Sequence, residues 1–154
     1  MALFLSTFIN KIDKKGRISV PAQFRPYLSD ENFSGVILYE SFINPSIEGC
    51  NIERIKKLSD AIDNLDPFCE DRDSFATTIL AGSMQISMDA DGRIILPDNL
   101  IAIADLKEKA IFVGKGKTFE IWQPEKFSNY MSSAKIKAKE KRNILRINNK
   151  DNNA

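Results

Sequence analysis

The chain has 154 residues, which is enough for one ordinary domain or for two small half-domains that share a core. Hydrophobic residues make up 43% of the chain and charged residues 28%, as in globular proteins, and the net charge of +1 gives no sign of a uniformly basic nucleic-acid binder. The absence of histidine removes the commonest general base and metal ligand, and we therefore expect neither a zinc site nor a Ser-His or Cys-His catalytic pair.

The N-terminal segment MALFLSTFI has no basic residue ahead of a short apolar stretch that Ser6 and Thr7 interrupt. This pattern favours a strand over a signal peptide, and nothing in the sequence approaches the roughly 20 apolar residues that span a bilayer. We therefore expect a cytoplasmic protein without a membrane segment. Cys50 and Cys69 are far apart in sequence and form no CxxC motif, so free thiols are expected, at least one of them buried.

Segment 8–21, FINKIDKKGRISVP, is repeated as segment 84–97, MQISMDADGRIILP. Five identities share one register: Asp13, Gly16, Arg17, Ile18 and Pro21 recur as Asp89, Gly92, Arg93, Ile94 and Pro97. In each copy the aspartate favours the start of a turn and the glycine permits a positive φ, which together predict a tight hairpin between two strands. A short helix is expected after each hairpin, at 21–25 and at 97–101, and Pro26 is expected to end the first one.

Both copies continue with two more predicted strands and a helix. Segment 35–39 corresponds to 110–114, and segment 47–50 corresponds to 119–122. Four short strands bury little apolar surface alone, so we expect the two halves to interleave around a pseudo-two-fold axis and share one core. The predicted fold class is α+β, a tandem pair of β repeats with flanking helices.

Helices are predicted between the copies and after the second one. An amphipathic helix follows from the spacing of Ile52, Ile55, Leu58, Ile62 and Leu65. Asp66-Pro67 breaks that helix, and a second helical segment is expected from about Asp71 to Ala81. The last helix is expected to start at Pro124, and the polar residues 148–154 are expected to be disordered.

The two hairpins differ in charge. Segment 10–26 has a net charge of +4, from Lys11, Lys14, Lys15, Arg17 and Arg25 against Asp13. Segment 86–101 has a net charge of −2, from Arg93 against Asp89, Asp91 and Asp98. Because DNA phosphates bind cations, the first hairpin is the candidate DNA-binding element and the second its structural partner. The alternative is that the first hairpin is only a solvated basic turn.

Within the first hairpin, Arg17 is the candidate base-reading residue because a guanidinium can make a bidentate contact with guanine. Lys11, Lys14, Lys15 and Arg25 complete the candidate DNA-binding set, the lysines being suited to phosphate contacts. Alternatively, Asp13 holds Arg17 in a turn-stabilising salt bridge, as Asp89 would hold Arg93. The DNA contact and the salt bridge of Arg17 are compatible if Asp13 fixes the hairpin that faces DNA. The residues expected to structure the hairpins are Asp13, Gly16, Asp89, Gly92 and Arg93.

Two further segments are strongly charged. Segment 135–150 has a net charge of +6 and either adds non-specific DNA affinity or is a solvated helix end. Segment 60–73 has a net charge of −5, and we expect it to face away from DNA or to meet a basic neighbour in an oligomer.

An enzymatic alternative rests on Gly116-Lys117-Thr118, which resembles the end of a phosphate-binding loop. The full pattern needs a glycine at position 111, which is Ile111, and a helix after the loop, where segment 119–122 has the pattern of a strand. A hairpin turn explains these glycines better. No enzymatic activity, no cofactor and no metal are predicted.

The two repeated motifs, together with Val113-Gly114 and the segment KTFEIW at 117–122, resemble the MraZ family within the SpoVT/AbrB superfamily of swapped-hairpin DNA-binding proteins. The resemblance covers almost the whole chain. It implies a first SpoVT/AbrB-like repeat at 1–51, a helical connector at 52–81, a second repeat at 82–125, and a C-terminal helix with a basic, partly disordered tail at 126–154.

The resemblance also implies a function. The family's Asp-x-x-x-Arg motif falls on Asp13 and Arg17, and on Asp89 and Arg93. A sequence-specific DNA-binding transcriptional repressor is implied, which binds short G-rich direct repeats of double-stranded DNA in the promoter of its own division and cell-wall gene cluster. A ring-shaped homo-oligomer associated with the nucleoid is also implied. The alternative is an antitoxin-like or other protein-interaction module without specific DNA binding, but such a module is expected to have one hairpin half and a long tail.

Overall fold

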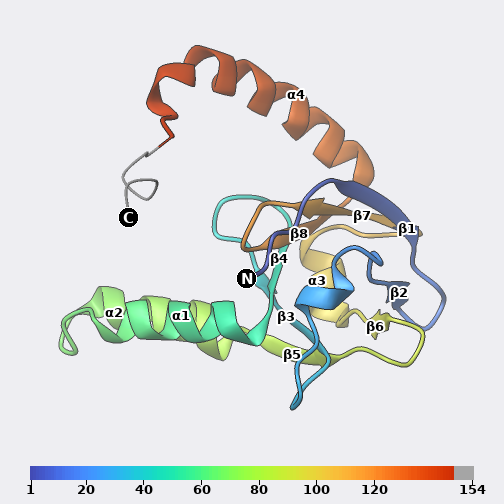
Figure 1. The fold of residues 1–154 in the computed structure, drawn as a ribbon, viewed down its shortest axis with the longest axis horizontal. Coiled ribbons are helices and arrows are strands. Elements are labelled where there is room, and N and C mark those ends of the chain that lie inside the picture. Colours follow the sequence, from blue (N-terminus) through green and yellow to red (C-terminus); the bar gives the residue numbers. More distant parts are fainter. Residues whose placement is uncertain (148–154) are drawn as a thin grey trace. The chain divides into compact units, whose positions relative to one another are not determined.

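The computed structural model describes residues 1–147, which form helices and antiparallel strands in an α+β fold (Figure 1). The predicted fold class is thus confirmed at this level. Residues 1–124 form one compact unit, and a second unit begins at Glu125.

Residues 1–124 contain eight strands. Their bounds are β1 (Thr7–Lys11), β2 (Arg17–Ser19), β3 (Gly35–Glu40), β4 (Ile47–Cys50), β5 (Met84–Ser87), β6 (Arg93–Ile95), β7 (Lys109–Gly114) and β8 (Phe119–Trp122). Six of them form one sheet in the order β1-β7-β8-β4-β3-β5, and β2 pairs with β6 in a separate two-stranded ribbon. All strands predicted from the repeat are present.

The strand pairing interleaves the two halves of the sequence. The first strand of each half pairs with the third strand of the other, since β1 is antiparallel to β7 and β5 is antiparallel to β3. Equivalent positions lie opposite each other where the halves meet, with Ile18 facing Ile94 in the ribbon and Glu48 facing Glu120 between β4 and β8. The halves therefore contribute equally to a shared sheet and a shared ribbon.

Two apolar clusters hold this unit together. The larger one joins the ribbon residues Ile18 and Ile94 to Phe4, to Phe24 and to buried side chains of the six-stranded sheet. Phe4 packs edge-on against Phe24 at 5.0 Å between ring centroids. The second cluster lies between strands β3 and β4 and the helices that follow them. Its buried members are Ile37, Tyr39, Cys50, Ile62 and Ile79.

The connector between the halves is helical, as predicted. Helix α1 (Ile52–Asp63) is capped by Asn51, whose side chain accepts a hydrogen bond from the backbone N–H of Arg54. Helix α2 (Glu70–Phe75) continues directly into a π-helical segment, η2 (Ala76–Ala81). The sequence predicted this segment as helical but gave no sign of the π geometry.

The two short helices after the hairpins differ. Helix α3 (Asp98–Ile103) follows Pro97 as predicted. The helix expected at 21–25 is instead a turn that leads into a 3₁₀ helix, η1 (Arg25–Tyr27), which contains Pro26. The prediction that Pro26 ends the helix was wrong, because a proline in the first turn of a helix sacrifices no intrahelical hydrogen bond.

Helix α4 (Pro124–Glu140) begins at the predicted proline, the last residue of the first unit, and its remaining residues belong to the second unit. A 3₁₀ turn, η3 (Arg142–Ile144), follows it. Residues 135–147, which carry most of the basic C-terminal run, are exposed. Lys150 and the rest of the tail predicted to be disordered lie outside the described residues. No helix in residues 1–147 is long and apolar enough to cross a membrane.

Candidate nucleic-acid interface

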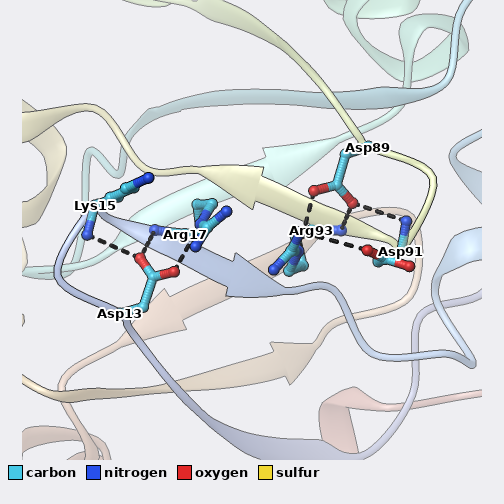
Figure 2. Close-up of polar contacts among 6 residues, drawn as sticks. All are labelled: Asp13, Lys15, Arg17, Asp89, Asp91 and Arg93. Atoms are coloured by element: carbon cyan, nitrogen blue, oxygen red, sulfur yellow. Dashed lines mark hydrogen bonds and ion pairs between the residues drawn. The ribbon is translucent and has the colours of Figure 1, made fainter.

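The first hairpin loop is built around the Asp13 carboxylate (Figure 2). One carboxylate oxygen, Oδ1, accepts hydrogen bonds from the backbone N–H groups of Lys15 at 2.9 Å and Arg17 at 2.8 Å. The other, Oδ2, accepts from Arg17 Nε at 2.7 Å. Gly16 has a φ of 80°, a conformation that favours glycine, and closes the turn with a hydrogen bond to the Asp13 carbonyl. Asp13 therefore fixes both the loop backbone and the direction of the Arg17 side chain.

The second loop repeats this construction. Asp89 accepts from the backbone N–H groups of Asp91 and Arg93, each at 2.9 Å, and from Arg93 Nε at 3.0 Å. Gly92 has a φ of 77°. The geometry of both loops fits the structural roles expected of the two aspartates and the two glycines. It also shows that the salt bridges between aspartate and arginine exist.

Electrostatics keep both aspartates ionised. The backbone N–H of Arg17 is the main cause that lowers the pKa of Asp13 from its ordinary value, and the Arg17 guanidinium lowers it further. Arg93 lowers the pKa of Asp89 in the same way. The loops are therefore held together by charged carboxylates at any pH above the ordinary titration range of aspartate.

One position distinguishes the surroundings of the two arginines. Arg93 Nη2 makes a second ion pair with Asp91 Oδ2 at 3.4 Å. The equivalent position in the first loop is Lys15, so Arg17 is paired with Asp13 and has a cation where Arg93 has a carboxylate (Figure 2). The positive charge of Arg17 is therefore less neutralised than that of Arg93.

Both arginines lie on the accessible face of the ribbon. Ile18 and Ile94 are buried beneath it, with 1% exposure each. Because side chains alternate along a strand, Arg17, Ser19, Arg93 and Ile95 share the opposite face. A two-stranded ribbon fits the major groove of B-DNA, where side chains of one face can reach base edges.

The candidate lysines surround the first loop. Lys14 and Lys15 are exposed in the loop, and Lys11 is exposed at the end of β1. Lys109, which the sequence reasoning missed, is exposed at the start of β7 and lies opposite Lys11 in the strand register. Nothing local pointed to Lys109, because strand pairing between the two halves brings it here.

Arg25 has a different environment from the other candidate cations. It is half-buried, and its Nε donates to the carbonyl of Val20 at 2.8 Å. Its guanidinium lies against the backbone of Gly92, where an added Cβ would be only 2.3 Å from Arg25 Cζ. Arg25 therefore packs against the second loop, and it is half-buried where the lysines of the first loop are exposed.

The acidic stretch and the ribbon lie at opposite ends of the first unit (Figure 1). Most carboxylates of the acidic stretch, segment 60–73, are on α1 and α2, where Asp63 pairs with Arg72 at 2.9 Å. Segment 60–73 therefore lies far from the ribbon, and its orientation relative to DNA or to a basic neighbour in an oligomer stays a prediction.

Other kinds of site find little support. The segment after Gly116-Lys117-Thr118 is strand β8 and not a helix, so the resemblance to a phosphate-binding loop fails on structural grounds. Both cysteines are free, and Cys50 is buried, as predicted. In residues 1–147 no group of carboxylate and thiol side chains could hold a metal ion.

Comparison with known proteins identifies the family. A family model described as "MraZ protein, putative antitoxin-like" matches residues 79–147. A protein of Pelagibacter ubique named "Transcriptional regulator MraZ" is 52% identical over 94% of this chain and 90% of its own length. Proteins with the same name from Rickettsia bellii and Rickettsia canadensis are 50% and 49% identical, over 97% and 95% of this chain and 100% and 98% of their own lengths. With similarity at this level along nearly its entire length, and with both Asp-x-x-x-Arg loops in place, the chain belongs to the MraZ family.

Proposed function

We propose that this chain is a sequence-specific DNA-binding transcriptional repressor that recognises short direct repeats in the promoter of its own division and cell-wall gene cluster. The observation that carries the proposal is the Arg17 side chain, held by Asp13 on the accessible face of a two-stranded ribbon with Lys14 and Lys15 beside it. The name of its relatives, "Transcriptional regulator MraZ", supports the same function.

The roles within the interface follow from charge and geometry. Arg17 reads guanine through its guanidinium, and Lys11, Lys14 and Lys15 bind phosphates. We extend the phosphate-binding set by Lys109, which lies opposite Lys11. Arg25 acts through the second loop, which it contacts at Gly92, and Arg93 acts mainly on the structure of that loop.

For the architecture, we propose two SpoVT/AbrB-like swapped-hairpin repeats at 1–51 and 82–125, a connector at 52–81 and a C-terminal region at 126–154. The exchange of β1 and β5 between the halves supports this division. The paired positions Ile18–Ile94 and Glu48–Glu120 support a pseudo-two-fold axis.

We further propose that the protein acts in the cytoplasm, associated with the nucleoid, as a ring-shaped homo-oligomer. The edge strands β1 and β5 of the large sheet present backbone groups that another copy can pair with. Leu3, Leu5 and Ile9 are each more than half exposed, which supports an apolar contact between copies near β1.

A second candidate function is a protein-interaction module of the antitoxin kind. The description of the matching family model favours it, as do the exposed apolar residues Ile144, Leu145 and Ile147 in the C-terminal segment. Binding to a partner protein with no preference for the promoter over shuffled DNA would support this candidate instead.

The test is a DNA-binding titration by fluorescence anisotropy across a salt series. The probes are the promoter upstream of the protein's own gene and a shuffled sequence of the same length. We expect clear preference for the promoter, and we expect Lys14→Ala to weaken binding to both probes and to reduce the salt slope by about 0.9 for each phosphate that the variant no longer neutralises. Lys56→Ala removes one exposed cation from α1, far from the ribbon, and serves as the control that leaves binding unchanged. Equal binding to both probes by the wild-type protein would refute the proposal.

A further inference from the structure

The accessible face of the ribbon contains one large apolar side chain, Ile95. It is 60% exposed and lies directly opposite Arg17 in the strand register. Its Cγ2 atom is 4.0 Å from where a Cβ on Gly16 would lie, so the side chain is next to the first loop. An apolar group therefore neighbours the arginine that we assign to base reading.

The fold itself does not require isoleucine at this place. The equivalent position of the first half is Ser19, which pairs with Arg93 in the same register. Both strands form the ribbon, one with a small polar residue and the other with a branched apolar one. Single exposed apolar residues are common on protein surfaces, but the equivalent strand position of the first half has serine in the same ribbon.

Resting on the proposed function, we propose that Ile95 reads the 5-methyl group of a thymine next to the guanine that Arg17 reads. Thymine is the base that presents an apolar group in the major groove. Residues directly opposite each other in an antiparallel pair have Cβ atoms about 5 Å apart. Stacked bases are about 3.4 Å apart along the DNA axis, so two such side chains are spaced to reach two neighbouring base pairs when the line between them is tilted from that axis. Arg17 and Ile95 can therefore reach neighbouring base pairs from one ribbon.

The asymmetry of the ribbon face gives the recognised sequence a direction. Arg17 and Arg93 occupy equivalent positions, and so do Ser19 and Ile95. If both ends of the ribbon had the same residues, it would read a palindrome. Ile95 lies opposite Arg17 while Ser19 lies opposite Arg93, so the two ends present different chemistry. The bases are read by the end with Arg17 and Ile95, and the recognised unit is not palindromic.

The experiment compares thymine with deoxyuridine, which lacks only the 5-methyl group. Each thymine of the wild-type recognition site is replaced in turn, and affinity is measured by anisotropy. We expect affinity to fall about three- to fivefold per engaged ribbon at one thymine next to a guanine, the value for one methyl group removed from an apolar environment. Ile95→Ser, which copies the first half, should bind thymine and deoxyuridine probes equally at that position and keep the preference for guanine.

The matched control is Ile43→Ser, which removes an 88% exposed isoleucine from the loop between β3 and β4 and should keep the wild-type discrimination. If Ile95→Ser does not fold, the probe series on the wild-type protein and on Ile95→Val still decides the question. Specific binding that is indifferent to every thymine methyl, or discrimination that persists in Ile95→Ser, overturns this inference alone. Absence of specific DNA binding overturns the proposed function, and this inference with it.

Discussion

Arg17 and Arg93 occupy equivalent positions, and each makes an ion pair with an aspartate. Their surroundings neutralise the positive charge of the two guanidinium groups to different degrees. Arg93 is bracketed by Asp89 and Asp91, whereas Arg17 has Lys15 in place of the second carboxylate. An anionic ligand should therefore prefer the first loop.

We expect Arg17→Ala to weaken specific DNA binding by about 1–3 kcal/mol per engaged site, the cost of one bidentate base contact. Arg93→Ala should leave DNA affinity nearly unchanged and lower stability instead, because it releases two ion pairs in the second loop. Binding titrations and thermal unfolding of both variants check this, with oligomeric state measured in parallel. Loss of DNA binding in an intact Arg93→Ala oligomer, with normal binding by Arg17→Ala, would invert the assignment.

A second pair of equivalent residues, Glu48 and Glu120, differs in protonation chemistry. Burial, followed by the neighbouring Glu120 carboxylate, raises the pKa of Glu48. Burial also acts to raise the pKa of Glu120, but hydrogen bonds from Lys115 and from Trp122 outweigh it, so the pKa of Glu120 is lowered. Glu120 Oε2 also accepts a hydrogen bond at 3.1 Å from the hydroxyl group of Ser46, which belongs to the other half.

These directions predict opposite effects for the same substitution. A raised pKa means that ionised Glu48 costs stability above the ordinary glutamate pKa, so Glu48→Gln should stabilise the protein at pH 7, by up to about 1 kcal/mol. That gain should vanish in acid, where Glu48 is protonated.

A lowered pKa means that Glu120 stabilises the fold above its ordinary pKa, and this stabilisation is lost as the pH falls through the lowered value. Glu120→Gln should therefore destabilise by about 1–3 kcal/mol at pH 7. Denaturant unfolding of both variants at pH 4 and pH 7 measures this, and effects of equal sign at pH 7 would contradict it.

The two hairpin loops have the same motif but are packed against different residues. Around Gly16, an added Cβ would meet Leu96 O at 3.4 Å and Ile101 Cδ1 at 3.9 Å, which are ordinary contact distances. Around Gly92, it would meet the Arg25 guanidinium at 2.3 Å. Both loops have positive φ, so the two glycines share the backbone cost of a substitution and differ in the packing cost.

We expect Gly92→Ala to cost about 1 kcal/mol more than Gly16→Ala, because the new methyl group displaces Arg25 from its hydrogen bond to Val20. In an Arg25→Ala background the two glycine substitutions should cost the same. Chemical denaturation of the single and double variants forms the required cycles. A Gly92→Ala penalty that survives removal of Arg25 would show that this arginine does not support the second loop.

For the whole molecule, the proposed ring presents several copies of the ribbon to one DNA molecule. Linked binding events raise affinity by about 10²–10⁴ without any new contact, provided that the geometry allows simultaneous engagement. DNA with two correctly phased repeats should therefore bind far more tightly than DNA with one repeat. Shifting one repeat by about half a helical turn, roughly five base pairs, keeps the sequence content and should remove the gain.

Affinity measurements on single, phased and out-of-phase probes check this expectation, with native mass spectrometry on the same samples. Equal affinity for one and two repeats would rule out linked binding. A monodisperse monomer at micromolar concentration would count against the ring itself.

Much of the local structure is encoded in nearby residues. The aspartate and glycine of each hairpin, the spacing of apolar residues in α1 and the proline at the start of α4 each specify a short-range conformation, and those elements form as predicted. The repeat also indicated the α+β class, because two copies of four short strands need each other to bury a core. The candidates Asp13, Arg17, Lys14 and Lys15 are neighbours in sequence, and a single loop is enough to bring them together.

The remaining features depend on partners that are distant in sequence. Arg25 was assigned to the basic hairpin by sequence proximity, but packing of the other half places it against Gly92. Lys109 joins Lys11, and Glu48 meets Glu120, through strand registers that no local pattern specifies. In the sequence Ile95 has only the pattern of a strand residue, and its place beside Arg17 follows from the pairing of β2 with β6. Short-range turns and periodicities arise from backbone and side-chain preferences within a few residues, whereas register is fixed by burying one face of every strand at the same time, and that requires the complete fold.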